Sequence, residues 1–569
     1  MAEAAGHHQP CWPRVALWAG VLGLVIVTAL GLWARLAGLD QARMVMDGLH
    51  PFLKGLAIVR GDEFPWRGAG GDFRFGALQA WCMAPLVVMA SSLRSLMGLY
   101  AIVHALGVPI MGLAGRRLGG WLTGVGAAGL YALWPVLLGH PHRGAQTYLA
   151  PVVLAAALWV ALILVTPHVR PSTARGVGLG ASLGASLGAL LALAVHHHPY
   201  AIAVAAGAVV LLPWIVRRRG WWAVVAMAVS GALVLAPMLV DNVLLLQERQ
   251  ASGAGTSLVQ DAGMLQETLG SLLHSCSLQS MGIMGQHSGI WPMLVPLLAL
   301  PLLFPRRKAP AVALPLVAWA TASWAILLVV AEVLGYLQPY HLSVVLPLHL
   351  LLGAWAVVGL LARIPLPRRS PYLELRFGLG LALGVALLVG TWGGLRLEVH
   401  GPLANPPAHL DELGVLEPAV AALRADAGDK PRVLGVLAET SVTRTGDPIA
   451  YFMDQWLAGE PDSSFLLIRP PEPGKPMVYV VADLAPETWA SWPETPDPIW
   501  QQELPGGSRA AVLSFAHVSA ARRWLRRGCD QFEARGLRIA GPWEGLAFMA
   551  RDLKPYHEEL VEWARVCDE

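Results

Sequence analysis

Long apolar runs alternate with short polar connections over most of the chain up to about residue 396. Most are about 17 to 25 residues long, which lets one helix cross the hydrocarbon core of a bilayer. They lie at about Pro13–Leu36, Leu96–Gly115, Trp121–Gly139, Thr147–Val165, Gly176–Val195, Pro199–Val216, Trp221–Val240, Ile290–Phe304, Pro310–Leu334, Leu342–Ala362 and Phe377–Gly394. The pattern predicts a polytopic α-helical membrane protein with about 11–12 membrane helices.

The pattern changes in the last part of the chain, where short strand-like and helix-like segments alternate. The predicted strands are Val433–Ala438, Phe465–Ile468, Val478–Val481, Ala510–Phe515 and Leu546–Ala550. The predicted helices are Leu416–Ala425, Ile449–Leu457, Ser519–Glu533 and Tyr556–Val566. This order indicates a soluble α/β domain over residues 397–569, tethered to a membrane domain over residues 1–396 with a large first outer loop, 38–75.

The membrane part and the tail also differ in charge. Charged residues make up only 14% of the chain, against about 25% in soluble domains, which excludes an ordinary soluble protein. Residues 1–396 hold 25 basic and 12 acidic side chains, whereas residues 397–569 hold 16 and 26. The formal net charge of +3 is therefore the sum of a basic membrane part and an acidic tail. An acidic tail outside the membrane also argues against nucleic acid as a partner.

Basic clusters at the ends of the apolar runs predict the orientation. Arg116-Arg117, Arg217–Arg219, Arg306–Lys308 and Arg363–Arg369 should face the cytoplasm. The tail is then extracytoplasmic, and frequent Ala, Gly and Arg favour a bacterial inner membrane. If the N-terminus is cytoplasmic, the shorter run Gly76–Ser91 must be re-entrant or lie along the membrane surface. The alternative is an N-terminus on the outer side.

One predicted helix carries two distinctive patterns. Gly180, Gly184 and Gly188 are four residues apart, a spacing that forms a smooth groove for close approach of another helix. The same run leads to His196-His197-His198 at an expected outer boundary. Three adjacent histidines of a regular helix cannot all face one metal. They are interpreted as a polar helix end or as a contact to a lipid phosphate.

Carboxylates are scarce in the membrane part, and none lies between Asp72 and Asp241. Five acidic and five basic residues gather instead in the first outer loop: Asp40, Arg43, Asp47, Lys54, Arg60, Asp62, Glu63, Arg67, Asp72 and Arg74. A helical hairpin does not need a connection of this length and charge. The loop is therefore either an interfacial amphipathic helix whose charges face water or part of a reaction site.

The loop resembles the first outer loop of the GT-C superfamily of membrane glycosyltransferases, which includes protein mannosyltransferases and aminoarabinose transferases. In this family, an acidic residue after the first helix is followed about fifteen residues later by Gly-Asp/Gln-x-x-Pro. Asp47 and the sequence Gly61-Asp-Glu-Phe-Pro65 are similar to that pattern. Four later segments also resemble family motifs in the same order: Gly71–Trp81, Gly115–Gly120, Leu130–Pro135 and Tyr340–Pro347. The resemblance covers residues 13–362.

The resemblance implies an integral membrane glycosyltransferase of the inverting type. Its donor would be a polyprenyl-phosphate-linked sugar, and its acceptor a glycan, lipid or protein on the outer side. Asp47 would be the base that deprotonates the acceptor hydroxyl, or would bind a metal that does so. Residues that would bind the donor phosphate or the substrate are Arg60, Arg67, Asp72, Arg74, Arg143 and His341. Membrane lipid is the other expected partner.

The chain departs from the family pattern in two ways. Members often show two adjacent acids, but Gly48 follows Asp47. Some place another acid in the next outer loop, where this chain has His140 and His142 instead. Neutral imidazole binds divalent ions, so these histidines are either metal ligands or ordinary polar loop residues. The alternatives to an enzyme are a transporter or flippase for a lipid-linked substrate and a catalytically silent membrane scaffold.

Overall fold

The structure, a computed structural model, describes the main part of the membrane helices and part of the tail. The described segments are 12–42, 76–134, 149–166, 174–251, 312–334, 343–361, 413–427, 432–439, 477–484, 495–504, 509–516 and 537–540, with single positions between them. Contacts divide the chain into two compact units. The first holds Met1–Ala34, Val103–Leu138 and Leu149–Leu395, and the second holds Arg35–Ile102, Gly139–Tyr148 and Arg396–Glu569.

Helices form most of the described part of the chain. They are α1 (Trp12–Ala37), η1 (Leu39–Gln41), α3 (Leu78–Met89), α4 (Leu93–Ala105), α5 (Gly107–Gly119), α6 (Trp121–Leu133), α8 (Ala150–Val165), α9 (Ala174–His197), η3 (Pro199–Ala201), α10 (Ile202–Gly207), η4 (Ala208–Leu211), α11 (Leu212–Arg219), α12 (Trp221–Ala251), α15 (Ala313–Leu334), α16 (Leu346–Leu361) and α19 (Leu413–Ala427).

Six helical stretches among the described residues are long and apolar enough to cross a membrane, judged by length and composition. They are Ala16–Ala37, Leu93–Gly119, Gly176–His197, Pro199–Arg219, Trp221–Glu248 and Ala313–Val330. The prediction of a multi-pass helical membrane protein is thereby confirmed. The predicted helices Ile290–Phe304 and Phe377–Gly394 lie outside the described residues.

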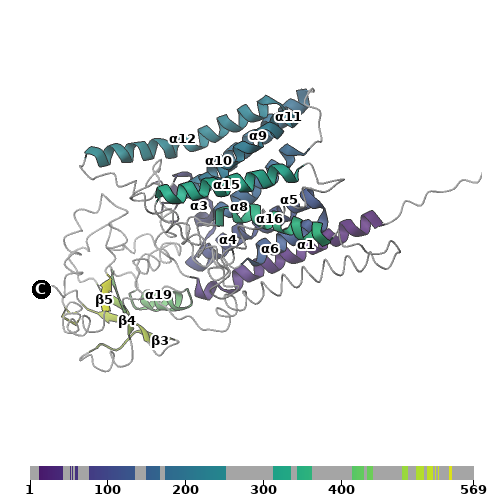
Figure 1. The fold of residues 1–569 in the computed structure, drawn as a ribbon. Coiled ribbons are helices and arrows are strands. Elements are labelled where there is room, and N and C mark those ends of the chain that lie inside the picture. The colour runs from purple at the N-terminus through teal and green to yellow at the C-terminus, as the bar shows by residue number, and fades with distance from the viewer. Residues whose placement is uncertain are drawn as a thin grey trace, which may run out of the picture. The chain divides into compact units, whose positions relative to one another are not determined.

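Close packing of α9 against α12 gives the glycine pattern its structural role. Figure 1 shows the two helices side by side. A Cβ atom added to Gly184 or Gly188 would collide with the backbone oxygen of Ala223 or Met227, respectively. The Ser230 hydroxyl of α12 also donates to the Ala185 carbonyl of α9 at 2.7 Å. As predicted from the spacing, these glycines form a surface for close helix approach.

Two of the arginine clusters meet at the C-terminal end of α8. Arg219 donates to the carbonyls of Ile163 and Leu164 at 2.5 and 3.2 Å. Arg117 donates from Nε to Thr166 Oγ1 at 3.4 Å. This arrangement agrees with the expectation that both clusters lie on one side of the membrane. We call the group Arg116, Arg117, Arg217, Arg218 and Arg219 the arginine end.

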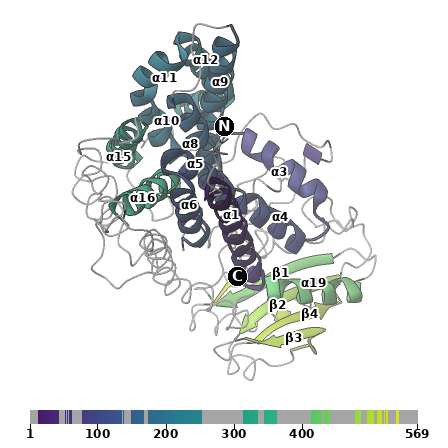
Figure 2. The same cartoon turned by 90° about the vertical axis from the view of Figure 1, so that its right-hand side faces the viewer.

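A mixed sheet forms the core of the described tail within the second unit (Figure 2). Its strands are β1 (Arg432–Glu439), β2 (Met477–Leu484), β3 (Trp500–Glu503), β4 (Arg509–Phe515) and β5 (Leu537–Ala540), in the order β3-β4-β2-β1-β5. Only β1 and β2 pair in parallel, with Leu434 opposite Tyr479, whereas the other neighbours are antiparallel. Three predicted strands thus correspond to β1, β2 and β4.

The remaining strand predictions have a different outcome. The sequence did not predict the short strands β3 and β5. The expected strands Phe465–Ile468 and Leu546–Ala550 lie outside the described residues, as do the expected helices Ile449–Leu457 and Tyr556–Val566.

Helix α19 matches the predicted helix Leu416–Ala425 and packs against β3 and β4. Its apolar residues Val415, Leu416, Ala419, Val420 and Leu423 are buried, a spacing that places them along one helical face. In β4, Ala510, Ala511, Val512 and Leu513 are all buried, because this strand has neighbours on both sides. The expected α/β character of the tail is confirmed for these elements.

The length of helix α3 bears on whether the short run Gly76–Ser91 crosses the membrane completely. It has 12 residues, Leu78–Met89, and therefore a length of about 18 Å. A hydrocarbon core is about 30 Å thick, so α3 alone is too short to cross it. This length favours the re-entrant or surface arrangement over a complete crossing.

Candidate functional site

The predicted site residues fall in segments that are not described. Asp47, Arg60, Arg67, Asp72, Arg74, His140, His142, Arg143 and His341 all lie outside the described residues. The structure therefore does not test whether these side chains come together. What it does describe is how the chain is held on both sides of Asp47 and which polar groups lie at the helix ends nearby in sequence.

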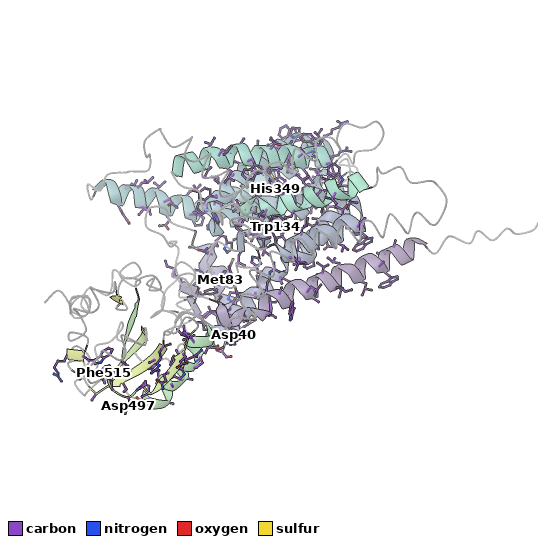
Figure 3. All side chains as sticks on the ribbon, turned by 60° about the horizontal axis from the view of Figure 1, so that its bottom comes forward. Asp40, Met83, Trp134, His349, Asp497 and Phe515 are labelled. Carbon is purple, nitrogen blue, oxygen red and sulfur yellow. The ribbon has the colours of Figure 1, made fainter. Side chains whose placement is uncertain are left out.

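An ion-pair cluster holds the chain before Asp47. Arg94, at the start of α4, contacts Asp40 Oδ1 through Nη2 at 2.7 Å and Glu417 Oε2 through Nε at 2.7 Å. The next turn is closed by a hydrogen bond from the Ala42 amide to the Leu39 carbonyl at 3.0 Å, and Ala42 is fully buried. Asp40, labelled in Figure 3, is therefore fixed seven residues before Asp47.

A second contact holds the chain after Asp47. The rings of Phe52 and Tyr100 pack edge to face with centroids 5.7 Å apart, and both side chains are buried. Gly55 lies so close to α3 that an added Cβ would come within 3.1 Å of the Ala84 amide nitrogen. A larger residue would push this segment away from α3. The stretch that carries Asp47 is thus anchored within five residues on either side, at Ala42 and at Phe52.

The glycine of the proposed family motif has a conformation that suits glycine. Gly61 has φ of 74°, in the left-handed region that residues with a Cβ rarely occupy. Its amide donates to the Ile58 carbonyl at 3.1 Å and closes a turn. The local backbone thereby explains why glycine stands at this position.

Sequence reasoning missed the role of Arg94. Its two partners are 54 residues before it and 323 residues after it, so no local pattern signals the cluster. The one local cue is that Glu417 interrupts an apolar run in the predicted helix. Arg94 joins the segment after α1, the start of α4 and α19 within the second unit.

The histidine triplet lies at the opposite end of α9 from the arginine end. An added Cβ on Gly180 would be 3.1 Å from the Arg219 carbonyl oxygen, whereas His196 Nε2 lies 2.7 Å from the Val234 carbonyl oxygen. Sixteen residues of helix separate Gly180 from His196, a rise of about 24 Å. The predicted helix boundary is correct, since α9 ends at His197.

All three histidines are buried. His198 Nδ1 accepts a hydrogen bond from the Tyr200 amide at 3.1 Å and caps the short helix η3. The His198 and Tyr200 rings also meet edge to face, with centroids 5.5 Å apart. Among the described residues, no group of three His, Cys, Asp or Glu side chains is arranged to hold a metal ion. The triplet is thus a packed polar helix end.

Asp241 differs from the sequence-based expectation. The predicted helix ends at Val240 and leaves Asp241 in an outer loop, but α12 continues to Ala251 and Asp241 is 1% exposed. Asp241 lies on the buried face that also carries Met238 and Leu245. The prediction was wrong because a polar residue in a helix was taken as its end. A buried acid within an apolar helix is an unusual and costly placement.

Trp324 and His349 form another buried polar pair, and hydrogen bonds engage both side chains. Trp324 Nε1 donates to His349 Nε2, and His349 Nδ1 lies 2.8 Å from the Val345 carbonyl oxygen. Both ring nitrogens of His349, labelled in Figure 3, are therefore engaged. This bonding joins α15 to α16 and leaves the imidazole without a nitrogen for acid–base chemistry.

Comparisons with known proteins give similarity of structure at low sequence identity. No protein-family model matches the sequence, and no curated protein matches it. The apo structure of ArnT from Cupriavidus metallidurans aligns with a TM-score of 0.45 and 15% identity, covering 87% of this chain and 98% of that one. The same protein bound to undecaprenyl phosphate gives a TM-score of 0.44 and 16% identity, with 86% and 97% covered.

An oligosaccharyltransferase from Archaeoglobus fulgidus, in a complex with Zn and sulfate, aligns with a TM-score of 0.47 and 15% identity. The alignment covers 81% of this chain and 68% of that one. All three TM-scores are below 0.5. The alignments report which structures the chain is similar to, and no reaction or ligand of this chain follows from them.

Proposed function

We propose that the protein is a membrane glycosyltransferase that uses a polyprenyl-phosphate-linked sugar as donor. The observation that carries the proposal is the anchored acidic loop: Asp47 stands between Ala42 and Phe52, which are both buried. A general base has to be held in place to be effective, and anchoring on both sides supplies this condition. The order of the five family-like motifs along the sequence supports the same reaction class.

Each group has a defined role in the proposed reaction. The Asp47 carboxylate accepts the proton of an acceptor hydroxyl, and the hydroxyl oxygen forms a bond to the anomeric carbon. The bond between that carbon and the phosphate oxygen breaks, and polyprenyl phosphate leaves with the electron pair. Attack opposite the leaving group inverts the anomeric configuration. The acceptor is a glycan, a lipid or a protein.

Cations offset the charge of the leaving phosphate. We assign this role to Arg60, Arg67, Arg74, Arg143 and His341, with Asp72 as a substrate contact. Arg143 precedes Leu149 by six residues, and α8 runs from there to the arginine end. Arg143 is thus joined to the far end of α8, which suits a site on the side of the membrane away from the arginines.

A divalent metal ion is a candidate cofactor, with His140 and His142 as its ligands. When bound, it would act as a Lewis acid towards the donor phosphate. We place the site at the outer face of a bacterial inner membrane, with the C-terminal domain also extracytoplasmic. These assignments rest on the sequence.

The decisive test is replacement of Asp47 in liposomes that contain the full chain, a polyprenyl-phosphate-linked sugar and an envelope fraction as acceptor. Asp47→Asn should lower the release of polyprenyl phosphate by about 100-fold or more. Glu63→Gln, which removes another acid of the same loop at an unspecified position of the motif, should retain activity. Full activity of the Asp47→Asn protein would overturn the assignment of the base. Passage of labelled lipid across the bilayer without cleavage would overturn the reaction class in favour of transport.

A further inference from the structure

The arginine end combines three helix C-termini with five positive charges. Helix α5 ends after Arg116 and Arg117, α11 ends at Arg219, and the last carbonyls of α8 accept hydrogen bonds from Arg219. Each helix C-terminus carries about half a negative charge. Three of them balance about one and a half of the five positive charges, so a clear positive excess remains.

No described carboxylate of the first unit is close enough to balance this excess. The described acidic side chains of that unit are Asp241 and Glu248, both near the far end of α12. Helix α12 begins at Trp221, next to the arginine end, so Asp241 is about 30 Å away along the helix. Charges separated by more than about 10 Å are largely screened at physiological salt. Among the described side chains of the first unit, none therefore supplies the counter-charge.

The five arginines have different surroundings. Arg219 is buried and donates to three carbonyls of α8, the third being Thr166 O at 3.1 Å. Arg116 stacks on the Trp121 ring, with its Cζ 4.2 Å from the ring centroid. Arg117 donates a hydrogen bond to Thr166 from its Nε atom. The Nε atom of Arg218 is buried and has no hydrogen-bond partner in the described part of the chain. Neither Arg117 nor Arg218 forms an ion pair with a described acidic side chain, so their guanidinium charges suit an added anion.

Two tryptophans favour a lipid over a free anion. Trp221 and Trp222 follow the arginines of α11 after a single glycine and are 69% and 64% exposed. Exposed tryptophan beside a basic cluster is typical of the interface between headgroups and acyl chains. The exposed face of α12 continues with Val225 and Val229, an apolar surface on which an acyl chain can lie.

We propose that the arginine end binds the phosphate headgroup of an anionic phospholipid, with Arg117 and Arg218 as the principal donors. The lipid belongs to the leaflet in contact with this end of the helices. Basic pockets between membrane helices are suited to such headgroups. The bound lipid supplies negative charge and separates the guanidinium groups. The arginine end lies next to the start of α9, whereas the histidine triplet lies at the other end of that helix, and none of its arginines is among the residues assigned to the reaction.

The test is lipid binding to the purified full chain in detergent, measured by native mass spectrometry with phosphatidylglycerol, phosphatidylcholine or inorganic phosphate. We expect retention of phosphatidylglycerol in preference to phosphatidylcholine. The double variant Arg117→Gln/Arg218→Gln should bind phosphatidylglycerol about 30-fold more weakly, since each basic residue near an anionic surface contributes about fivefold. Arg509→Gln, a change in the sheet of the tail, is the matched control and should bind as the unchanged protein does.

Three outcomes would overturn the proposal. The first is equal retention of the two lipids, and the second is unchanged binding by the double variant. The third is displacement of the lipid by millimolar phosphate, which would indicate a free-anion site. The variant Arg117→Lys/Arg218→Lys keeps both charges and should retain the preference for phosphatidylglycerol. Loss of the preference by this variant, eluting as a single symmetric species, would also contradict a site based on charge.

Discussion

Replacement of Arg94 should release α19 from the segment that follows α1. Arg94 is 39% exposed and contacts Asp40, which is 63% exposed, and Glu417, which is 25% exposed, each at 2.7 Å. A solvent-exposed ion pair contributes about 0.2 to 1 kcal/mol. We assign about 0.5 kcal/mol to the pair with Asp40 and about 1 kcal/mol to the less exposed pair with Glu417. The sum, about 1.5 kcal/mol, corresponds to a factor of about ten in an equilibrium constant.

Hydrogen exchange of the α19 amides measures this release directly. Arg94→Gln should speed exchange across Leu413–Ala427 by about tenfold. The control is Arg509→Gln, because Arg509 lies 3.9 Å from Glu503, which is 86% exposed. Breaking that weaker pair should change exchange in α19 by less than about twofold. Unchanged exchange in the Arg94 variant, or an equal rise in both variants, would refute the reasoning.

Two packing predictions concern the first unit. Gly184→Ala should lower the midpoint of thermal unfolding in detergent and cost about 1 to 3 kcal/mol, because the added Cβ meets the backbone of α12. Gly178→Ala, on the same helix with nothing within 4 Å of its added Cβ, should not. Trp319→Phe removes a buried donor bonded to the Val204 carbonyl at 2.8 Å and should cost about 1 to 3 kcal/mol in the same assay. The exposed Trp18→Phe is its control, and equal shifts within either pair would contradict the packing argument.

The membrane helices could be predicted because their signal is local. The sequence between Trp221 and Val240 is almost continuously apolar, and that alone predicts a helix. Its end could not be read in the same way, since α12 continues through Asp241 to Ala251. Periodicity would have been the better guide here. Asp241 comes three residues after Met238 and four before Leu245, about one turn from each, and so lies on the same buried face.

Contacts between segments far apart in the sequence cannot be predicted from local hydrophobic patterns. Arg94 follows two serines at the start of a helix and looks like an ordinary interfacial cation. Only the fold brings Glu417 to it across 323 residues. Short strands show the same limit: β3 has four residues, Trp500–Glu503, of which only every second one is exposed. Too few positions alternate there for the pattern to stand out from a polar loop.

Asp47 was predicted as the base because carboxylates are scarce in the membrane part and because it follows the first helix. The structure adds a limit on where this residue can lie. Five residues of fully extended chain reach at most about 18 Å. Asp47 is therefore confined by chain length alone to within about 18 Å of the Cα positions of both Ala42 and Phe52. Both anchors belong to the second unit, where Arg94 holds Asp40 and Tyr100 holds Phe52. Changes at either anchor should therefore act on the position of the carboxylate and not on its chemistry, so the acid itself and its anchors can be separated by mutation.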